Sequence, residues 1–407
     1  MTILVQKFGG TSLQSPASIS KVITHIKEAV EKKYKLVVVV SALGRLPDPY
    51  ATDTLLSLVN ESTSFHSKRE MDLLMSCGET IASVVLSNEL QDHKVKSIAL
   101  TGAQAGIMTT SEFTQAKIRG VNTARLKSEL ETYDVVVVAG FQGKTSTGEI
   151  TTIGRGGSDT TAAALGVALQ AEKVEIFTDV NGIMTADPRI VKSARQLKIV
   201  TYAEICNLAY QGAKVVHPRA IELVMQANIP LHVRSTYSTE NGTLVTNAAI
   251  KEIPDQLITG IAHMSSITQI RIKNREEMHR LHSEVFKVLA ETGISVDFIN
   301  ISPTGLLFTV PEFHTQSAVD CITNLGFHPQ VIENCAKVSV VGGGMMGVPG
   351  IASKIVQALT EREIQILQSA DSHTTIWVLI RDTDVMKAVN TLHETFNLSQ
   401  SLKPAGK

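Results

Sequence analysis

A lysine and two glycines stand where the first apolar strand is expected to end, in the segment VQKFGGTS over residues 5–12. Because glycine has no Cβ atom, Gly9 and Gly10 can let backbone N–H groups approach an anion, and Lys7 adds a compact positive charge. The segment is not a Walker loop, since the lysine of that motif follows its glycines. It indicates a phosphate site, and a strand that ends in an ordinary glycine turn is the alternative.

A second candidate anion site lies in TTIGRGGSDTTAAAL, residues 151–165, where Arg155, Ser158 and Asp159 precede an alanine-rich helix. A guanidinium group can donate two parallel hydrogen bonds to a carboxylate or a phosphate. Alternatively, Ser158 and Asp159 simply cap the helix, as these residue types commonly do. Two later segments, FTDVNGIMTADPR (177–189) and YQGAKVVHPRA (210–220), also combine turn residues with cations.

These motifs must be positioned by the elements around them. Runs of β-branched residues without polar alternation are typical of parallel strands covered on both faces, and they occur at 36–42, 134–140 and 174–177. Between the first motif and the first of these runs, apolar residues recur at helical spacing over 19–30. This alternation predicts a doubly wound, mostly parallel α/β domain with ligands at the carboxyl ends of its strands.

The last third of the chain contains an internal repeat. A shift of 70 positions pairs residues 285–310 with 355–380 without a gap, so that Leu289 meets Leu359 and Ile294 meets Ile364. Short strands are expected to open the two units at 267–272 and 337–341. The repeat predicts two ferredoxin-like βαββαβ modules, with a last strand supplied by the tail after Leu398.

Composition limits the possible partners. The 407 residues suffice for two or three domains, and 43% hydrophobic with 19% charged residues is typical of a globular protein with a large core. The net charge of −1 gives no basic field for nucleic acid or a membrane surface, and no apolar run reaches membrane length, so the cytoplasm is expected. The scattered cysteines indicate neither a zinc site nor a disulfide framework, and no metal ligands are predicted among the side chains.

With these motifs in this order, the chain resembles the aspartate kinases of the amino acid kinase superfamily, in their monofunctional bacterial form. The resemblance rests on VQKFGGTS, SCGET, GRGGSDTT, FTDVNGIMTADPR and the repeated modules, and it covers essentially the whole length. It implies a catalytic domain over 1–245, a linker over 246–260, and two ACT modules over 261–330 and 336–401. The chain departs from many relatives in QSADSHTTIWV (368–378), so the resemblance does not identify the effector. It also has PDPYATDTLL (47–56), a longer lead into the threonine on the substrate side than some relatives have.

The resemblance implies that the γ-phosphoryl group of Mg-ATP moves onto the side-chain carboxylate of L-aspartate, giving 4-phospho-L-aspartate and ADP. This is the first step toward lysine or diaminopimelate, threonine and methionine. An aspartate side chain, with a pKa of about 3.9, is already ionised at neutral pH and needs no general base. The enzyme must align this nucleophile and neutralise charge. Feedback inhibition by an amino acid of the lysine, threonine or diaminopimelate type is expected through the ACT modules.

The same resemblance implies the residues of the site. Arg155 would bind the substrate's α-carboxylate and Glu79 its α-ammonium, and the alternative for Glu79 is a charge on the surface of a helix. His217 is interpreted as structural. The catalytic residues would be Lys7 and Asp159; the nucleotide site would contain Lys7, Phe8, Gly9, Gly10, Thr178, Asp179, Met184, Asp187, Arg189 and Lys214; the aspartate site would contain Thr52, Glu79, Arg155, Gly156, Gly157 and Ser158.

The repeat also predicts how the protein is regulated. Each module should have an exposed sheet edge, and such edges can pair within or between chains, so a homodimer or higher homo-oligomer is expected. An effector at such an interface would contact Ser295, Asp297, Asn300 and Ser302, with its ammonium on Asp297. The alternative for Asp297 is a strand cap. The alternative for the whole protein is an amino-acid sensor with a decayed kinase domain, against which an intact Lys7, Arg155 and Asp159 argue.

Overall fold

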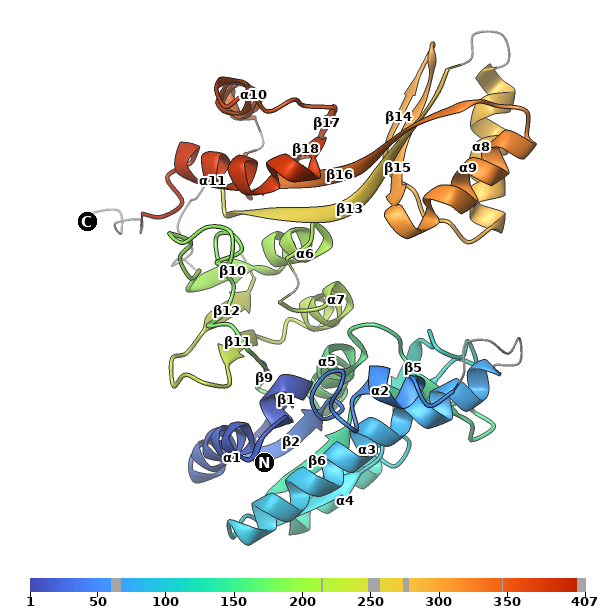
Figure 1. The fold of residues 1–407 in the computed structure, drawn as a ribbon. Coiled ribbons are helices and arrows are strands. Elements are labelled where there is room, and N and C mark those ends of the chain that lie inside the picture. The colour runs from blue at the N-terminus through green and yellow to red at the C-terminus, as the bar shows by residue number, and fades with distance from the viewer. Residues whose placement is uncertain (60–66, 214, 248–256, 274–277, 346, 401–407) are drawn as a thin grey trace. The chain divides into compact units, whose positions relative to one another are not determined.

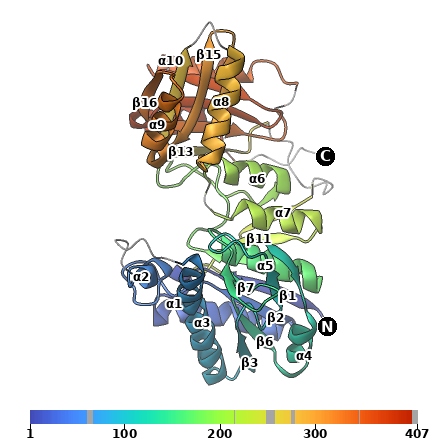
Figure 2. The same cartoon turned by 90° about the vertical axis from the view of Figure 1, so that its right-hand side faces the viewer.

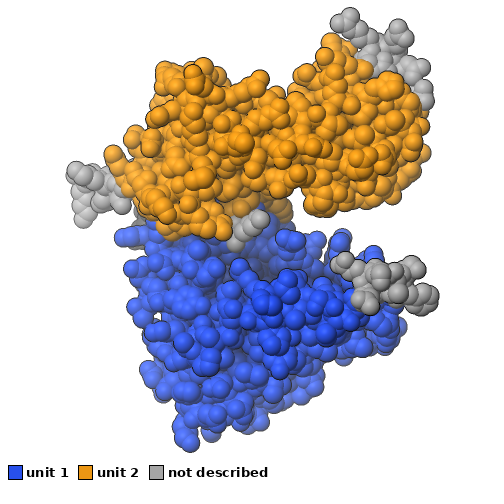
Figure 3. All heavy atoms as spheres, viewed as in Figure 1, with its two compact units in different colours: residues 1–183, 196–209, 214–253 blue, residues 184–195, 210–213, 254–407 orange. Residues whose placement is uncertain are grey.

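A computed structural model describes the chain except for residues 60–66, 214, 248–256, 274–277, 346 and 401–407. It contains two compact units, which are described separately below (Figure 3). Two short segments that precede residue 245, 184–195 and 210–213, pack with the second unit. The first unit comprises residues 1–183, 196–209 and 214–253, and the second comprises 184–195, 210–213 and 254–407.

The first unit is built on an eight-stranded sheet in the order β10-β12-β11-β9-β1-β2-β6-β3. All neighbours pair in parallel except β11 and β12, which confirms the predicted doubly wound, mostly parallel sheet. Strand β6 is apolar throughout, and β2 is apolar after Lys35, because helices cover both faces of the sheet. The strands are β1 (Ile3–Phe8), β2 (Lys35–Val40), β3 (Ser97–Leu100), β6 (Val135–Ala139), β9 (Lys173–Thr178), β10 (Ile199–Thr201), β11 (Leu231–Ser235) and β12 (Thr243–Thr246).

Helices α1 (Pro16–Glu31) and α3 (Lys68–Asp92) share one hydrophobic core with β1, β2 and β6, and they lie side by side on that face of the sheet (Figure 2). Helix α5 (Gly157–Leu169) packs against β1, β2 and β9, and α7 (Pro218–Gln226) packs on α5. The remaining helices described in the unit are η1 (Gly10–Leu13), α2 (Thr52–Leu56), α4 (Ala124–Thr132) and α6 (Tyr202–Tyr210).

A second, four-stranded sheet in the order β5-β4-β7-β8 belongs to the same unit, and the sequence did not predict it. Its strands are three or four residues long, too short for a hydrophobic period to stand out. Strand β8 packs against α3 and leads directly into the GRGGSD segment. The strands are β4 (Ile107–Thr109), β5 (Ile118–Val121), β7 (Gln142–Lys144) and β8 (Ile150–Thr152).

The second unit has one six-stranded sheet in the order β14-β15-β13-β16-β18-β17 (Figure 1). Helices α8 and α9 pack on one half of it, and α10 and α11 pack on the other half, each pair over its own core. The elements are β13 (Gly260–Lys273), α8 (Met278–Glu291), β14 (Asp297–Ser302), β15 (Gly305–Pro311), η2 (Glu312–His314), α9 (Thr315–Asn324), β16 (Pro329–Val341), α10 (Ile351–Glu361), β17 (Gln368–Asp371), β18 (Thr375–Arg381), η3 (Asp382–Asp384) and α11 (Val385–Thr395).

The two predicted modules are present, but they share strands. The expected short strands at 267–272 and 337–341 are halves of β13 and β16, which pair antiparallel along almost their whole length. The second module takes its outer strand from Gly260–Met264, which pairs with Lys337–Val341. The edge at which a last strand after Leu398 was predicted is already occupied, and residues 398–400 form a turn. The rest of that predicted strand, 401–407, lies outside the described residues.

None of the helices in the described part of the chain is long and apolar enough to span a membrane. The four cysteines are free thiols.

Candidate active site

Strands β9, β1, β2 and β6 are neighbours in the sheet, so their carboxyl ends meet at one edge. Lys7 lies near the end of β1, and the loops after β2, β6 and β9 begin at Ser41, Gly140 and Asp179. Most of the residues implied by sequence for phosphate and aspartate binding lie at the carboxyl end of β1, in the loop after β2, or around the start of α5. The fold therefore brings together segments that are about 170 positions apart in the chain.

Lys7 and Asp159 form an ion pair at this edge, with 2.7 Å between Lys7 Nζ and Asp159 Oδ1. Both side chains are 13% exposed, so a ligand can still reach them. The backbone N–H of His217 donates to the other carboxylate oxygen, Asp159 Oδ2, at 3.2 Å. The lysine is thus held in place by a carboxylate that is itself anchored in the first turn of α5.

The glycine turn after β1 is required by the packing of the chain itself. A Cβ atom on Gly10 would lie 2.6 Å from the carbonyl oxygens of Ala42 and Gly44, closer than real contacts allow. Gly44 N donates to Gly10 O at 3.0 Å, so the loop after β2 rests directly on the turn. Gly9 has an extended backbone (φ −75°), and a Cβ there would lie 3.6 Å from Lys7 Nζ. The turn is therefore fixed in place next to the lysine.

Glu79 of α3 is buried, at 3% exposed, so the interpretation as a surface charge was wrong. Its Oε1 accepts a hydrogen bond from Ala42 N at 3.1 Å, whereas the buried Oε2 has no partner among the described residues. Burial raises the pKa of Glu79 from 4.5 to about 7, against the smaller opposite effect of the Ala42 hydrogen bond. A carboxyl group with one unused oxygen is suited to receive an ammonium group from a ligand.

Sequence reasoning did not identify two neighbours that place Glu79. Ala42 supplies the N–H donor, and Gly78 lets α3 approach the loop after β2. A Cβ on Gly78 would lie 2.8 Å from Ala42 Cβ and 3.0 Å from Tyr50 O. The same close packing brings α2, which begins at the half-buried Thr52, against α3. In the sequence, only the glycine directly before the glutamate in SCGET could have indicated this close approach of α3 to the loop after β2.

The GRGGSD segment does not use Ser158 and Asp159 as helix caps, so the capping alternative was wrong. Helix α5 begins at Gly157 with Gly156 as its cap and no side-chain cap hydrogen bond. Gly154 and Gly156 have φ values of 78° and 72°, which glycine adopts without strain. A Cβ on Gly156 would lie 2.2 Å from the His217 ring, so His217 packs on the loop. Arg155, which lies in the middle of this loop, is exposed.

The residues implied for nucleotide binding divide between the two units. In the first unit, Thr178 Oγ1 donates to Asp179 Oδ1 at 3.1 Å, and Asp179 faces Arg45 at 3.9 Å. Met184, Asp187 and Arg189 belong to the second unit, where the Arg189 guanidinium pairs with Asp187 at 2.7 Å and lowers the pKa of that carboxyl group. Lys214 lies outside the described residues.

The residues implied for regulation lie in the second unit, and Asp297 already has a partner. Its Oδ2 forms an ion pair with Lys337 of β16, whose side chain is 6% exposed, and its Oδ1 accepts from Phe298 N at 2.7 Å. Ser295 is exposed in the turn before β14. Asn300 lies elsewhere on the strand, so the structure does not gather all four residues in one pocket.

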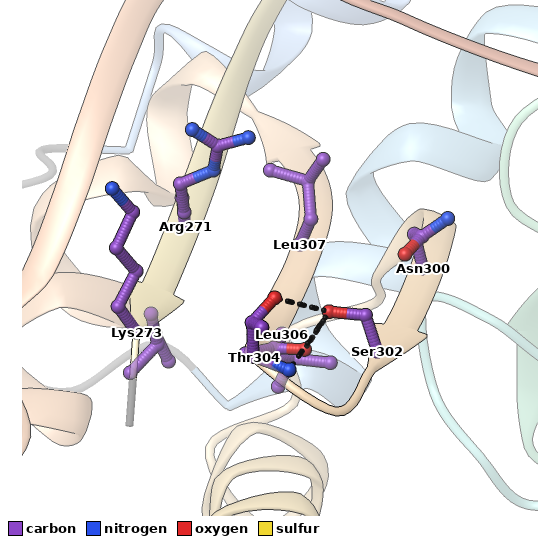
Figure 4. A pocket seen from close by; sticks show the side chains of 9 residues that line it. Arg271, Lys273, Asn300, Ser302, Thr304, Leu306 and Leu307 are labelled. Atoms are coloured by element: carbon purple, nitrogen blue, oxygen red, sulfur yellow. Dashed lines mark hydrogen bonds between the residues drawn. The ribbon is translucent and has the colours of Figure 1, made fainter. Parts of the chain in front are cut away.

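Asn300 and Ser302 line a pocket of about 560 Å³ on the face of the sheet that α8 and α9 leave open (Figure 4). Asn300, Leu307 and Arg271 are direct neighbours across β14, β15 and β13. Figure 4 shows Arg271 and Lys273 extending from β13 beside one another. Within the part of the chain that the structure describes, neither cation is near an acidic partner.

Comparisons with known proteins agree with this architecture. A model of the amino acid kinase family matches residues 2–235, and an ACT domain model matches residues 330–394. Aspartokinase 1 of Bacillus subtilis is 56% identical over 404 residues, which cover 98% of this chain and 100% of that protein. Aspartokinase of Geobacillus stearothermophilus is 40% identical, covering 98% of each chain. The structure of E. coli aspartokinase III with aspartate and ADP superimposes with a TM-score of 0.81 at 24% identity, covering 97% of this chain and 99% of that one.

Proposed function

This chain belongs to the aspartokinase family, and we propose that it transfers the γ-phosphoryl group of ATP to the side-chain carboxylate of L-aspartate, giving 4-phospho-L-aspartate and ADP. It is an ATP-dependent aspartate kinase, and the reaction would be the first step toward lysine or diaminopimelate, threonine and methionine. The observation that carries the proposal is one sheet edge with both the Lys7–Asp159 pair and the unused oxygen of Glu79.

In the proposed reaction, an oxygen of the substrate's carboxylate forms a bond to the γ-phosphorus while the bond to the bridging oxygen of ADP breaks. The electron pair of the broken bond leaves with ADP. No proton has to be removed, because the nucleophile is already ionised, so the protein contributes alignment and charge neutralisation. Lys7 stabilises negative charge on the transferring group, and Asp159 keeps the lysine aimed at it.

The substrate would be held through its two α-substituents. Glu79 receives the α-ammonium on its unused oxygen, and Arg155 binds the α-carboxylate with two parallel hydrogen bonds. Thr52, Ser158 and the amides of Gly156 and Gly157 complete this aspartate site. The phosphates lie on Lys7, Phe8, Gly9 and Gly10, and the remaining nucleotide contacts are assigned to Thr178, Asp179, Met184, Asp187, Arg189 and Lys214.

Mg²⁺ would accompany ATP in this reaction. Among the described residues no three acidic, histidine or cysteine side chains come together as a ligand set. This suits an ion held chiefly by phosphate oxygens and water, which is how Mg²⁺ commonly binds beside one or two carboxylates. When bound, the ion neutralises phosphate charge, and Asp159 orients either its hydration shell or Lys7.

A direct assay tests the function. The protein is mixed with ATP, Mg²⁺ and L-aspartate, and the acyl phosphate is trapped with hydroxylamine as a hydroxamate. We expect hydroxamate to form only when all three are present. Its absence would favour the alternative that the protein is an amino-acid sensor acting only through its ACT modules.

We also propose feedback inhibition by an end-product amino acid of the lysine, threonine or diaminopimelate type. Of the four residues assigned to the effector, Ser295, Asp297, Asn300 and Ser302, the last two line the pocket in Figure 4, and the cations of that pocket would suit the effector's carboxylate. Its ammonium would have to compete with Lys337 for Asp297. A structure of E. coli aspartokinase III, 25% identical, was solved with lysine and aspartate, which supports this kind of effector. Screening these amino acids in the hydroxamate assay identifies the inhibitor.

A homodimer or higher homo-oligomer in the cytoplasm is proposed as the working form. β14 is an edge strand of the six-stranded sheet, and it exposes Ile299 (49%) and Ile301 (56%). An apolar edge strand favours pairing with another chain. Light scattering on the purified protein measures the mass, and Ile301→Lys should lower it if this edge forms the contact.

A further inference from the structure

Helix α3 carries a second buried carboxyl group, that of Asp72, which the proposed aspartate site does not use. Asp72 is 0% exposed, and both of its oxygens accept hydrogen bonds. Thr114 N lies 3.0 Å from each oxygen, Thr152 N lies 2.9 Å from Oδ2, and Thr152 Oγ1 lies 2.6 Å from Oδ1. All these donors are neutral. Burying a carboxyl group away from cations costs desolvation free energy. We therefore interpret its hydrogen bonds as a means of fixing the segments that donate them, which an apolar side chain could not do.

Both threonines lie next to the loop that carries Arg155. Thr152 is the last residue of β8, and Gly154 opens the loop two positions later. Thr114 lies against the same loop, since a Cβ on Gly154 would lie 3.2 Å from Thr114 O. Thr114 has a φ of 72°, an unfavourable conformation for threonine that needs support from its surroundings. Asp72 therefore fixes both segments that border the base of the loop.

Asp72 and Glu79 lie seven positions apart on α3, which is two helical turns along the same face. The two carboxyl groups are used differently: both oxygens of Asp72 have protein donors, whereas Oε2 of Glu79 has none among the described residues. One helix thus holds the loop of Arg155 through Asp72 and offers Glu79 to the substrate.

We propose that Asp72 is a positioning residue that sets the distance between Arg155 and Glu79, the two groups assigned to the α-carboxylate and the α-ammonium of L-aspartate. This inference rests on the roles proposed above for those two residues. A ligand held at both ends is sensitive to that distance, because a shift of about 1 Å in a reacting group can cost on the order of 100-fold in rate. The nucleotide phosphates, on the β1 turn, should be much less sensitive.

The test compares the Michaelis constants of both substrates in Asp72→Asn. An amide nitrogen at this position would face an N–H donor, so at least one contact to Thr114 or Thr152 is lost. We expect KM for L-aspartate to rise about 10- to 100-fold while KM for Mg-ATP stays within about twofold. Thr152→Val removes only the hydroxyl contact to Asp72 and should raise KM for L-aspartate about 3- to 10-fold. This variant tests the proposal if Asp72→Asn does not fold.

Ser87→Ala is the matched control. Ser87 is buried on the same helix, and its hydroxyl lies 3.1 Å from that of Ser97, about four turns from Asp72 and away from the loop. It should lower the melting temperature and leave KM for L-aspartate unchanged. If Asp72→Asn and Thr152→Val behave like this control, the positioning role is wrong.

Arg155→Lys, measured in parallel, separates this inference from the proposed site. If Arg155→Lys raises KM for L-aspartate and the Asp72 and Thr152 variants do not, only the positioning role fails. If Arg155→Lys leaves KM for L-aspartate unchanged, the assignment of Arg155 fails and the role of Asp72 falls with it.

Discussion

The catalytic edge of the first unit and strand β14 of the second unit each carry a carboxyl group assigned to a ligand's ammonium, but the two groups have different partners. Glu79 has one oxygen bonded to a backbone N–H and one oxygen without a partner, so a ligand's ammonium adds a contact without displacing one. Asp297 already holds the ammonium of Lys337, which comes from the other module. The first arrangement suits a substrate that must bind at every turnover, and the second suits an effector that has to displace an internal competitor.

The largest effect in this comparison is expected from Lys7→Ala. The variant removes charge stabilisation from the transferring phosphoryl group and leaves Asp159 without its cation. We expect kcat to fall by about 1,000-fold or more, with an unchanged far-ultraviolet spectrum, since no core contact is lost. Steady-state kinetics by the hydroxamate assay measures this, and a kcat near that of the wild type would remove Lys7 from the chemistry.

Arg155→Lys should mainly weaken aspartate binding. A lysine ammonium cannot reproduce two parallel hydrogen bonds to one carboxylate, so KM for L-aspartate should rise about 10- to 100-fold. KM for Mg-ATP is the internal reference. If that constant alone moved, Arg155 would belong to the nucleotide site.

Glu79 should make aspartate binding depend on pH. Its pKa is raised to about 7, and an ammonium ligand favours the ionised form, so protons compete with the substrate. KM for L-aspartate should be about 10-fold higher at pH 6 than above pH 8. Glu79→Gln should bind aspartate weakly with no such slope. A slope that survives in Glu79→Gln would point to another titrating group.

The same raised pKa has a consequence for stability. The folded protein holds its proton more tightly than the unfolded chain between pH 4.5 and about 7, so the free energy of unfolding should fall as the pH rises through this range. The loss amounts to at most about 3 kcal/mol. Thermal melts of wild type and Glu79→Gln across this range measure it. A wild-type curve as flat as that of the variant would contradict the burial of an unpaired carboxyl group.

The smallest effects on uninhibited activity are expected in the second unit. Lys337→Met frees Asp297, so the effector should inhibit at a severalfold lower concentration. Asp297→Ala should relieve inhibition, but it also leaves the largely buried Lys337 without its partner, which destabilises the fold. The double variant Asp297→Ala/Lys337→Met avoids that destabilisation and should be insensitive to the effector, with kcat within about twofold of the wild type.

Inhibition curves for the effector found by screening, measured on all four proteins, decide whether the two regions differ as described. Superimposable curves for wild type and Asp297→Ala/Lys337→Met would move the effector site to the second module. There, Asp371 and His373 line a separate pocket of about 660 Å³.

The sequence by itself determined the elements that depend on local pattern. The valine-rich run in β2 has no polar alternation, and only a strand covered on both faces tolerates that pattern. The glycine turn beside Lys7 followed from residue type, and the repeat at 70 positions was sufficient to predict two modules. In each case the information lay in the order and type of residues along the chain.

Only the tertiary structure decided which distant groups meet. Lys7 and Asp159 pair across 152 positions, Glu79 is buried by the loop after β2, and Asp72 holds a strand and a turn from another part of the chain. The tertiary structure also decided that Gly260–Met264 forms the outer strand of the second module. Local periodicity states which face of an element is apolar, but the order of strands in a sheet depends on the packing of the whole domain.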